Sequence, residues 1–243
     1  MPDLPGWIVL VGGALAGSVV GGVAGFGAGV ILLPLVAWTL GFRAAVPVLT
    51  VTMFLGNLSR VWWSRRDVDP AVVAGFLAGA VPATALGAVL YAGVTNEWLG
   101  RIIGGFLIAA VPLRRVLASG RFTMRLGYFP PLGAGIGFLS SLVVTTGPVN
   151  TPFFLAYGLR RGAYIGTEAV CAAAMHVTRG AVLVGYALLT WDAVALGLVL
   201  GGAMFVGAWL ARRMLERMSD RVFLVLVEAL LVLLGLQFLL VPR

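Results

Sequence analysis

Five ionisable side chains lie inside apolar stretches of this sequence, where a charged group is costly to bury. They are Arg60, Glu168, His176, Arg179 and Glu228. Because ionisable groups are rare inside membrane segments, each is a candidate for a functional role. Arg179 is the leading candidate, since a planar guanidinium group can bind an oxyanion through two parallel hydrogen bonds. The competing interpretation is that Arg179 forms a structural ion pair.

Three of these residues share the stretch 166–189. Glu168 precedes Arg179 by eleven residues, so on a helix the two would share a face while lying about 16 Å apart. His176 is about one turn from Arg179, and histidine changes charge near neutral pH. Glu168 and His176 are therefore candidates for coupling protons to the movement of a ligand. A neutral His176, hydrogen-bonded within a helix bundle, is the alternative.

The remaining two ionisable residues have strong structural alternatives. Arg60 lies near the end of its apolar stretch beside Trp62 and Trp63. Extension of its side chain to the membrane surface therefore competes with contact to a ligand. Glu228 stands alone in the last apolar stretch and is expected to pair with another helix.

Two runs of small residues interrupt the apolar sequence in matching ways, within 21–45 and 133–163. Each has a proline five residues after a glycine, then a short apolar run, then a Gly-hydrophobe-Arg triplet. Matching interruptions in two halves point to a transporter binding site. Helix breaks are expected at Pro34, Pro148 and Pro152. The residues predicted to bind substrate are Gly25, Gly27, Gly29, Arg60, Thr145, Thr146, Gly147, Asn150 and Arg179.

The chemistry at the two interruptions favours an anion. A half-helix that begins near Val30 or Val149 would present free N–H groups and the positive end of its dipole. In the second interruption Thr145, Thr146 and Asn150 add hydrogen-bonding side chains. We interpret these three as lining a cavity, with local capping of the broken backbone as the alternative.

The composition defines a membrane protein. The chain of 243 residues is 60% hydrophobic and 11% charged, whereas soluble domains carry about 25% charged residues. All seventeen basic residues are arginines, and most of them lie in short clusters between apolar runs, which is typical of membrane-protein loops and does not indicate nucleic-acid binding. The single Cys171 excludes an internal disulfide and a cysteine-based metal site. The sequence predicts no metal and no cofactor.

Hydropathy predicts an all-α polytopic protein with eight to ten membrane segments and two short half-helices that are broken or re-entrant. We expect one transmembrane domain over 1–243, with one repeat at about 6–118 and another at about 127–241. Five segments in each repeat would invert the second relative to the first. The predicted segments are 6–24, 30–40, 46–64, 71–94, 99–117, 127–144, 148–158, 166–189, 193–211 and 222–241.

The arginine clusters predict the orientation in the bilayer. With the N-terminus outside, the clusters at 65–66, 114–125, 160–161 and 212–221 all fall in cytoplasmic loops, as the positive-inside rule requires. We therefore expect a multi-pass membrane protein with its N-terminus outside, surrounded by lipid. The glycine-rich helix faces permit a homodimer but do not require one.

The chain resembles the TauE/SafE family of sulfite and organosulfonate exporters. The motifs that carry the resemblance are GFGAGVILLPLVAWTLGFRAAVPVLT (25–50) and TTGPVNTPFFLAYGLRRGAYIGT (145–167). The chain departs from the family's glycine-rich pattern at Ala28, Thr145 and Thr146. The resemblance implies a bacterial inner-membrane carrier that moves a small sulfur oxyanion or sulfonate, usually outward.

These observations together predict a secondary transporter, not an enzyme, that exports a small anion by alternating access between two repeats. The sequence has no P-loop that would indicate ATP drive. An anion channel and an intramembrane enzyme that uses His176 are the alternatives. Neither His176 nor Cys171 has a nearby acid in sequence that would complete a catalytic set.

Overall fold

The computed structural model describes residues 2–93, 123–143 and 146–219, together with 222 and 225. These residues form eight α-helices and one 3-10 helix, with no strand among them, which confirms the predicted all-α class. In chain order they are α1 (Leu4–Ala24), α2 (Ala28–Leu40), α3 (Phe42–Ser64), α4 (Pro70–Gly93), η1 (Leu126–Tyr128), α6 (Phe129–Val143), α7 (Gly147–Tyr157), α8 (Arg161–Gly185) and α9 (Trp191–Glu216).

Each predicted segment within the described residues corresponds to one of these helices. The predicted segments 99–117 and 222–241 lie outside the described residues, apart from positions 222 and 225. Four helices are long and apolar enough to cross a membrane: α1, the Ala44–Ser64 part of α3, α4 and α9. The protein is therefore a multi-pass membrane protein.

Two helices are short, as the sequence predicts. α2 has 13 residues and α7 has 11. At about 1.5 Å per residue they are roughly 20 and 17 Å long, whereas the hydrocarbon core is about 30 Å thick. Neither helix could therefore span a bilayer alone.

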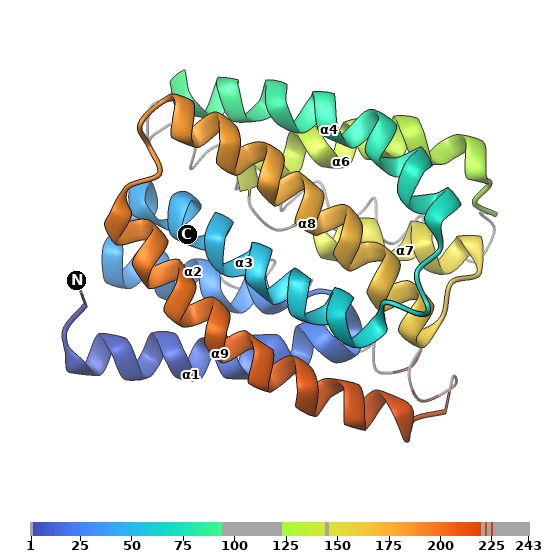
Figure 1. The fold of residues 1–243 in the computed structure, drawn as a ribbon, viewed down its shortest axis with the longest axis horizontal. Helices are drawn as coiled ribbons and strands as arrows, with labels where there is room; N and C mark the ends of the chain where they lie inside the picture. Colours follow the sequence, from blue (N-terminus) through green and yellow to red (C-terminus); the bar gives the residue numbers. More distant parts are fainter. Residues whose placement is uncertain (1, 94–122, 144–145, 220–221, 223–224, 226–243) are drawn as a thin grey trace.

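Helices from one half of the chain pack against helices from the other half (Figure 1). α3 and α8 pack together in the middle of the molecule. α9 packs on α1 and α3, and in the same way α4 packs on α6 and α8. The fourth helix of each half thus contacts the first and third helices of the other half. Two related repeats would pack in this way, while their inversion in the membrane stays a prediction.

Glycines allow close contact between helices that come from different halves of the chain. A Cβ atom added at Gly133 of α6 would collide with the carbonyl oxygen of Phe76 on α4, and one at Gly79 of α4 would collide with the backbone of α6. Between α1 and α9, a Cβ atom at Gly207 would collide with the Ser18 side chain. Small residues allow such close approach between membrane helices, where lipid offers no hydrophobic driving force.

We expect Gly133→Ala to lower the free energy of unfolding by about 1–3 kcal/mol, because the added methyl group must push α6 away from α4. Gly135→Ala on the same helix is the matched control, since no atom lies within 4 Å of the Cβ position there. The control should be neutral or up to about 1 kcal/mol stabilising, from the higher helix propensity of alanine. Denaturant unfolding in detergent measures both, and equal effects would contradict the packing argument.

Two of the expected helix breaks are wrong. Pro34 lies inside α2 and Pro152 lies inside α7, and both helices continue through the proline. A proline removes one backbone hydrogen bond, which membrane helices tolerate when neighbouring groups satisfy the freed carbonyl. Pro148 lies in the first turn of α7, directly after the second break, where its missing N–H costs nothing.

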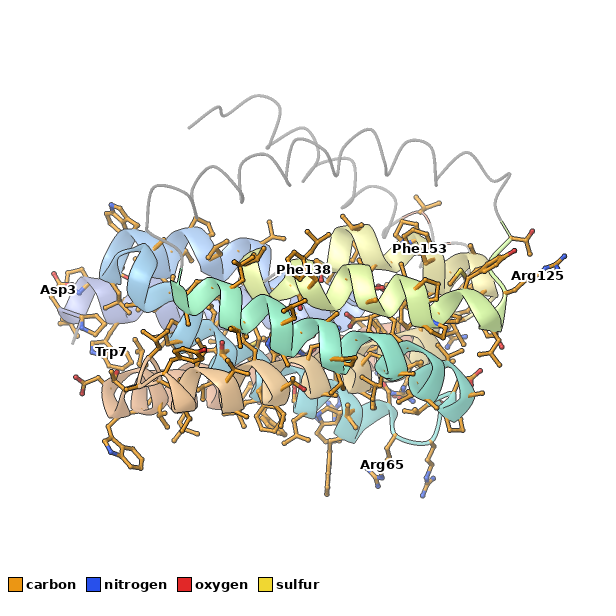
Figure 2. The ribbon with its side chains drawn as sticks, turned by 90° about the horizontal axis from the view of Figure 1, so that it is seen from above. Asp3, Trp7, Arg65, Arg125, Phe138 and Phe153 are labelled. Carbon is orange, nitrogen blue, oxygen red and sulfur yellow. The ribbon has the colours of Figure 1, made fainter. Side chains whose placement is uncertain are left out.

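The basic loops gather at one end of the bundle. Figure 2 shows Asp3 and Trp7 at one end, with Arg65 and Arg125 toward the other. The end of α9 is tied to the α3–α4 loop there, because Arg212 Nη1 lies 3.1 Å from Asp67 Oδ2. This distribution agrees with the clustering that the sequence predicts for one side of a membrane.

Candidate functional site

The break between α1 and α2 is made by two glycines in left-handed conformations. Gly25 has φ +80° and caps the end of α1, and Gly27 has φ +107° and precedes α2. Residues with a Cβ atom rarely adopt the left-handed conformation, so glycine is the expected residue at both positions. Gly25 also has no room for a side chain, because the ring of Tyr164 on α8 fills the space beside it.

The second break meets the first one. α6 ends at Val143 and α7 begins at Gly147, with Thr146 as the preceding cap residue. The side chain of Phe26, from the first break, packs so closely on Gly147 that it would collide with an added Cβ atom. Thr151 of α7 shares a 2.6 Å hydrogen bond with the Tyr164 hydroxyl group. The two breaks therefore form one polar and glycine-rich region.

Arg60 points into this region and does not extend to the membrane surface. Its Nη1 donates to the carbonyl oxygens of Gly25 at 2.6 Å and Gly21 at 3.4 Å, and its Nη2 donates to the Asn57 side chain. Nη1 also lies 3.0 Å from Glu168 Oε2. The last carbonyls of a helix lack partners within the helix, so Arg60 caps α1 where that helix breaks.

The carboxylate that faces Arg60 is deeply buried. Glu168 is 5% exposed, and its Oε2 lies at ion-pair distance from Arg60 without hydrogen-bond geometry. Asn150 of α7 is 1% exposed and faces the same carboxyl group, and no described residue donates to its Oδ1. Arg60, Glu168 and Asn150 thus lie together, as three of the predicted site residues on three different helices.

Arg179 is the centre of a second polar cluster and is 1% exposed. Its Nε donates to Thr50 Oγ1 at 2.9 Å, and its Nη1 donates to the carbonyl oxygen of Ser140 at 2.7 Å. Its Nη2 lies 2.7 Å from His176 Nδ1. Among the described residues, no carboxylate lies within ion-pair distance of Arg179. The expected alternative of a structural ion pair therefore has no partner in the described part of the chain.

The contact with Arg179 also determines the tautomer of His176. Because guanidinium nitrogens only donate, His176 Nδ1 must accept, and the ring proton of a neutral imidazole then lies on Nε2. His176 is also buried. The lone pair at Nδ1 is used by Arg179, so that nitrogen cannot act as the base that an intramembrane enzyme would need.

Five of the predicted site residues thus form two clusters. Arg60, Glu168 and Asn150 come together, and Arg179 and His176 come together, whereas Glu168 and Arg179 have separate partners although they share α8. Gly29 lies in the first turn of α2 and is buried there. Thr145 and Glu228 lie outside the described residues. Within those residues no group of three metal-binding side chains exists.

Sequence reasoning missed three residues that contact the two arginines, namely Asn57 and Thr50 on α3 and Ser140 on α6. It also missed Tyr164 on α8, which hydrogen-bonds Thr151 and packs against Gly25. One signal was available, because Asn57-Leu58-Ser59-Arg60 recurs 119 positions later as His176-Val177-Thr178-Arg179. Both tetrapeptides place a polar acceptor three residues before an arginine, which is one helical turn away.

A multi-pass helical bundle with two paired helix breaks and deeply buried arginines has the architecture of a membrane transporter. The family model for the sulfite exporter TauE/SafE matches residues 9–238, which is nearly the whole chain. The chain therefore belongs to the TauE/SafE family, whose members are membrane transporters of sulfur anions and not enzymes. No curated protein sequence and no solved structure matches the chain.

Proposed function

We propose that this protein is a secondary transporter that exports a small sulfur anion, sulfite or an organosulfonate, and that Arg179 binds the anion. The observation that carries the proposal is the isolated charge of Arg179, which is buried among described residues that supply only neutral acceptors. A buried charge without a partner is costly, so a fold retains one where a ligand supplies the partner.

The hydrogen bonds that Arg179 makes to described residues use only some of its N–H donors. A guanidinium group has five N–H donors, and Thr50, Ser140 and His176 accept three of them in the described part of the chain. The two that remain, one on each terminal nitrogen, can hold two oxygens of a sulfite or sulfonate group. The carbonyl end of α6 offsets about half a charge at most, so a net attraction for an anion remains.

The two helix breaks support the same proposal. Neither Gly27 nor Thr146 makes a side-chain cap to the helix that follows it. The first N–H groups of α2, near Gly29, therefore lack side-chain acceptors and can orient an anion, whereas α7 offers only the N–H of Gly147, since Pro148 has none and Val149 donates to the Thr146 carbonyl oxygen. Thr145, Thr146 and Asn150 belong to the same proposed lining of the path, with Gly25 and Gly27 allowing the backbone to approach.

In this proposal Glu168, and not His176, couples protons to the movement of the anion. Protonating His176 at Nδ1 would remove the acceptor that orients Arg179 and would place two donors against each other. Glu168 lies at the first break, where Arg60 and Asn150 both face its carboxyl group. We therefore treat His176 as a residue that positions Arg179.

The movement that we propose is alternating access between two inverted repeats. Its support is the exchange of partners by α4 and α9, which gives the two halves equivalent surroundings. A path that opens first to one side and then to the other would use these equivalent contacts in turn. A homodimer stays a prediction of the sequence.

The proposed substrate class is tested by thermal stabilisation of the purified protein with sulfite, thiosulfate, sulfoacetate, sulfate, lactate and chloride. A bound ligand stabilises the folded state by mass action, by about 2.7 kcal/mol at one hundred times its Kd. We expect a shift with sulfite or sulfoacetate and none with lactate or chloride. Equal shifts with every anion, or none with any, would contradict the proposal. Counterflow in proteoliposomes then separates a carrier from a channel.

Orientation is tested with single cysteines in a Cys171→Ala background. We propose that the basic end of the bundle is cytoplasmic and that the N-terminus is outside, in a bacterial inner membrane. A membrane-impermeant maleimide applied to intact cells should label Asp192→Cys and leave Arg65→Cys and Arg161→Cys unlabelled until the cells are opened. The reverse pattern would contradict the orientation, and labelling of only one of Arg65→Cys and Arg161→Cys in intact cells would contradict the repeat assignment.

A further inference from the structure

We infer that Arg60 forms a second anion site, equivalent to that of Arg179, which the chain's own Glu168 carboxylate occupies in this structure. The inference extends the proposed function, because it assumes that Arg179 and Arg60 bind the same class of ligand. It is argued from the contacts of the two arginines, which correspond one by one.

The first correspondence lies within each arginine's own helix. Arg60 Nη2 donates to the side chain of Asn57, and Arg179 Nη2 donates to the side chain of His176. In both cases the acceptor lies three residues before the arginine. One turn of helix therefore sets the direction of both guanidinium groups in the same way.

The second correspondence lies at the end of the first helix of each half. Arg60 Nη1 contacts the carbonyl oxygen of Gly21, the fourth residue from the end of α1. Arg179 Nη1 contacts the carbonyl oxygen of Ser140, the fourth residue from the end of α6. Each arginine thus caps the helix that leads into its own break.

The third correspondence crosses between the halves, and it is where the two sites differ. Arg179 contacts Thr50 on α3, and Arg60 contacts Glu168 on α8. Thr50 lies ten residues before Arg60 on α3, and Glu168 lies eleven residues before Arg179 on α8, so each contact comes from the N-terminal half of the opposite central helix. There one arginine meets a neutral hydroxyl group and the other meets an anion.

The surroundings of Arg60 are those of a binding site that is already filled. The Arg60 and Glu168 side chains are 13% and 6% exposed, and the cavity beside Arg60 has a volume of about 20 Å³. That space holds about one water molecule. A sulfite or sulfonate group can thus reach Arg60 only when the Glu168 carboxylate has left, so the anion and Glu168 exclude each other.

The test counts bound [35S]sulfite per chain in detergent, with size-exclusion chromatography as the check on folding. We expect one sulfite for the wild type, two for Glu168→Gln, and one for Glu168→Asp, which keeps the internal anion. Glu168→Gln with Arg179→Gln should retain one sulfite, bound at Arg60. One sulfite in Glu168→Gln and none in the double variant would overturn the inference while leaving the proposed function intact.

The same experiment also shows whether the Arg179 site fails while the Arg60 site stands. If the wild type binds no sulfite but the Glu168→Gln, Arg179→Gln double variant binds one, the proposed role of Arg179 fails and the Arg60 site stands. If neither binds, both proposals are wrong.

A reciprocal variant keeps the inference testable if Glu168→Gln does not fold. Thr50→Asp would place a carboxylate against Arg179, in the position that Glu168 has against Arg60. We expect at least tenfold weaker sulfite binding than in Thr50→Asn, which has the same shape without the charge. Equal binding by the two Thr50 variants would show that a carboxylate at this place does not act as an internal anion, and would overturn the inference.

Discussion

Replacing Arg179 with Gln is expected to abolish stabilisation of the protein by sulfite. Removing one partner of a buried charged pair costs about 2–5 kcal/mol of binding free energy, or roughly 30-fold to several thousand-fold in Kd. Arg179→Lys keeps the charge but loses the planar fork, so we expect an intermediate affinity. Thermal shifts as a function of sulfite concentration give the Kd values of all three proteins.

The control for this prediction is Arg65→Gln, since Arg65 lies on the exposed loop after α3 and contacts Trp62. It should bind sulfite as the wild type does. If Arg179→Gln folds and also binds sulfite with unchanged affinity, the anion site lies elsewhere.

Breaking the pair of Arg60 and Glu168 is expected to have the largest effect on stability. Arg60→Met leaves Glu168 buried and without its counter-charge, which costs about 3–5 kcal/mol of unfolding free energy. It also removes the group that donates to the carbonyl oxygen of Gly25. Arg60→Met with Glu168→Met should recover most of the loss, because no isolated charge then remains. Denaturant unfolding of the two single variants and the double variant gives the coupling energy.

An exposed pair provides the comparison. Arg212 Nε lies 2.8 Å from Glu216 Oε1 near the end of α9, and the Glu216 side chain is largely exposed. Glu216→Gln should change the unfolding free energy by no more than about 0.5 kcal/mol, as is usual for such pairs. A double variant of Arg60 and Glu168 that is no more stable than the worse single variant would contradict the pairing.

Much of the fold follows from the sequence because hydropathy determines where a membrane helix can lie. The expected half-helices α2 and α7 are present and short. The positions of the breaks were harder to predict, since proline and glycine both interrupt helices in sequence patterns. In the structure the left-handed residues Gly25 and Gly27 break the chain, whereas Pro34 and Pro152 remain helical.

The site was predictable only within single helices. The link between His176 and Arg179 follows from a spacing of three on one helix. The pairing of Arg60 with Glu168 depends on how α3 and α8 pack, and no local spacing encodes that register. The recurrence of Asn57 to Arg60 as His176 to Arg179 would have shown that the two arginines are equivalent, but not which residue each one faces.

The glycine contacts between α4 and α6, and between α1 and α9, limit which parts of the protein can move as bodies. At Gly133 the backbones of α4 and α6 are in contact, and at Gly207 the Ser18 side chain and the Leu15 carbonyl oxygen lie against α9, so neither pair can separate without opening a void. Each pair joins helices from opposite halves of the chain. Equally close contacts reach the central helices, because Gly197 and Gly201 of α9 pack against α3 and Gly166 of α8 packs against Ser64 at the end of α3. The two halves of the sequence are therefore not two separately packed bodies, and the helices that carry Arg60 and Arg179 lie where the halves meet.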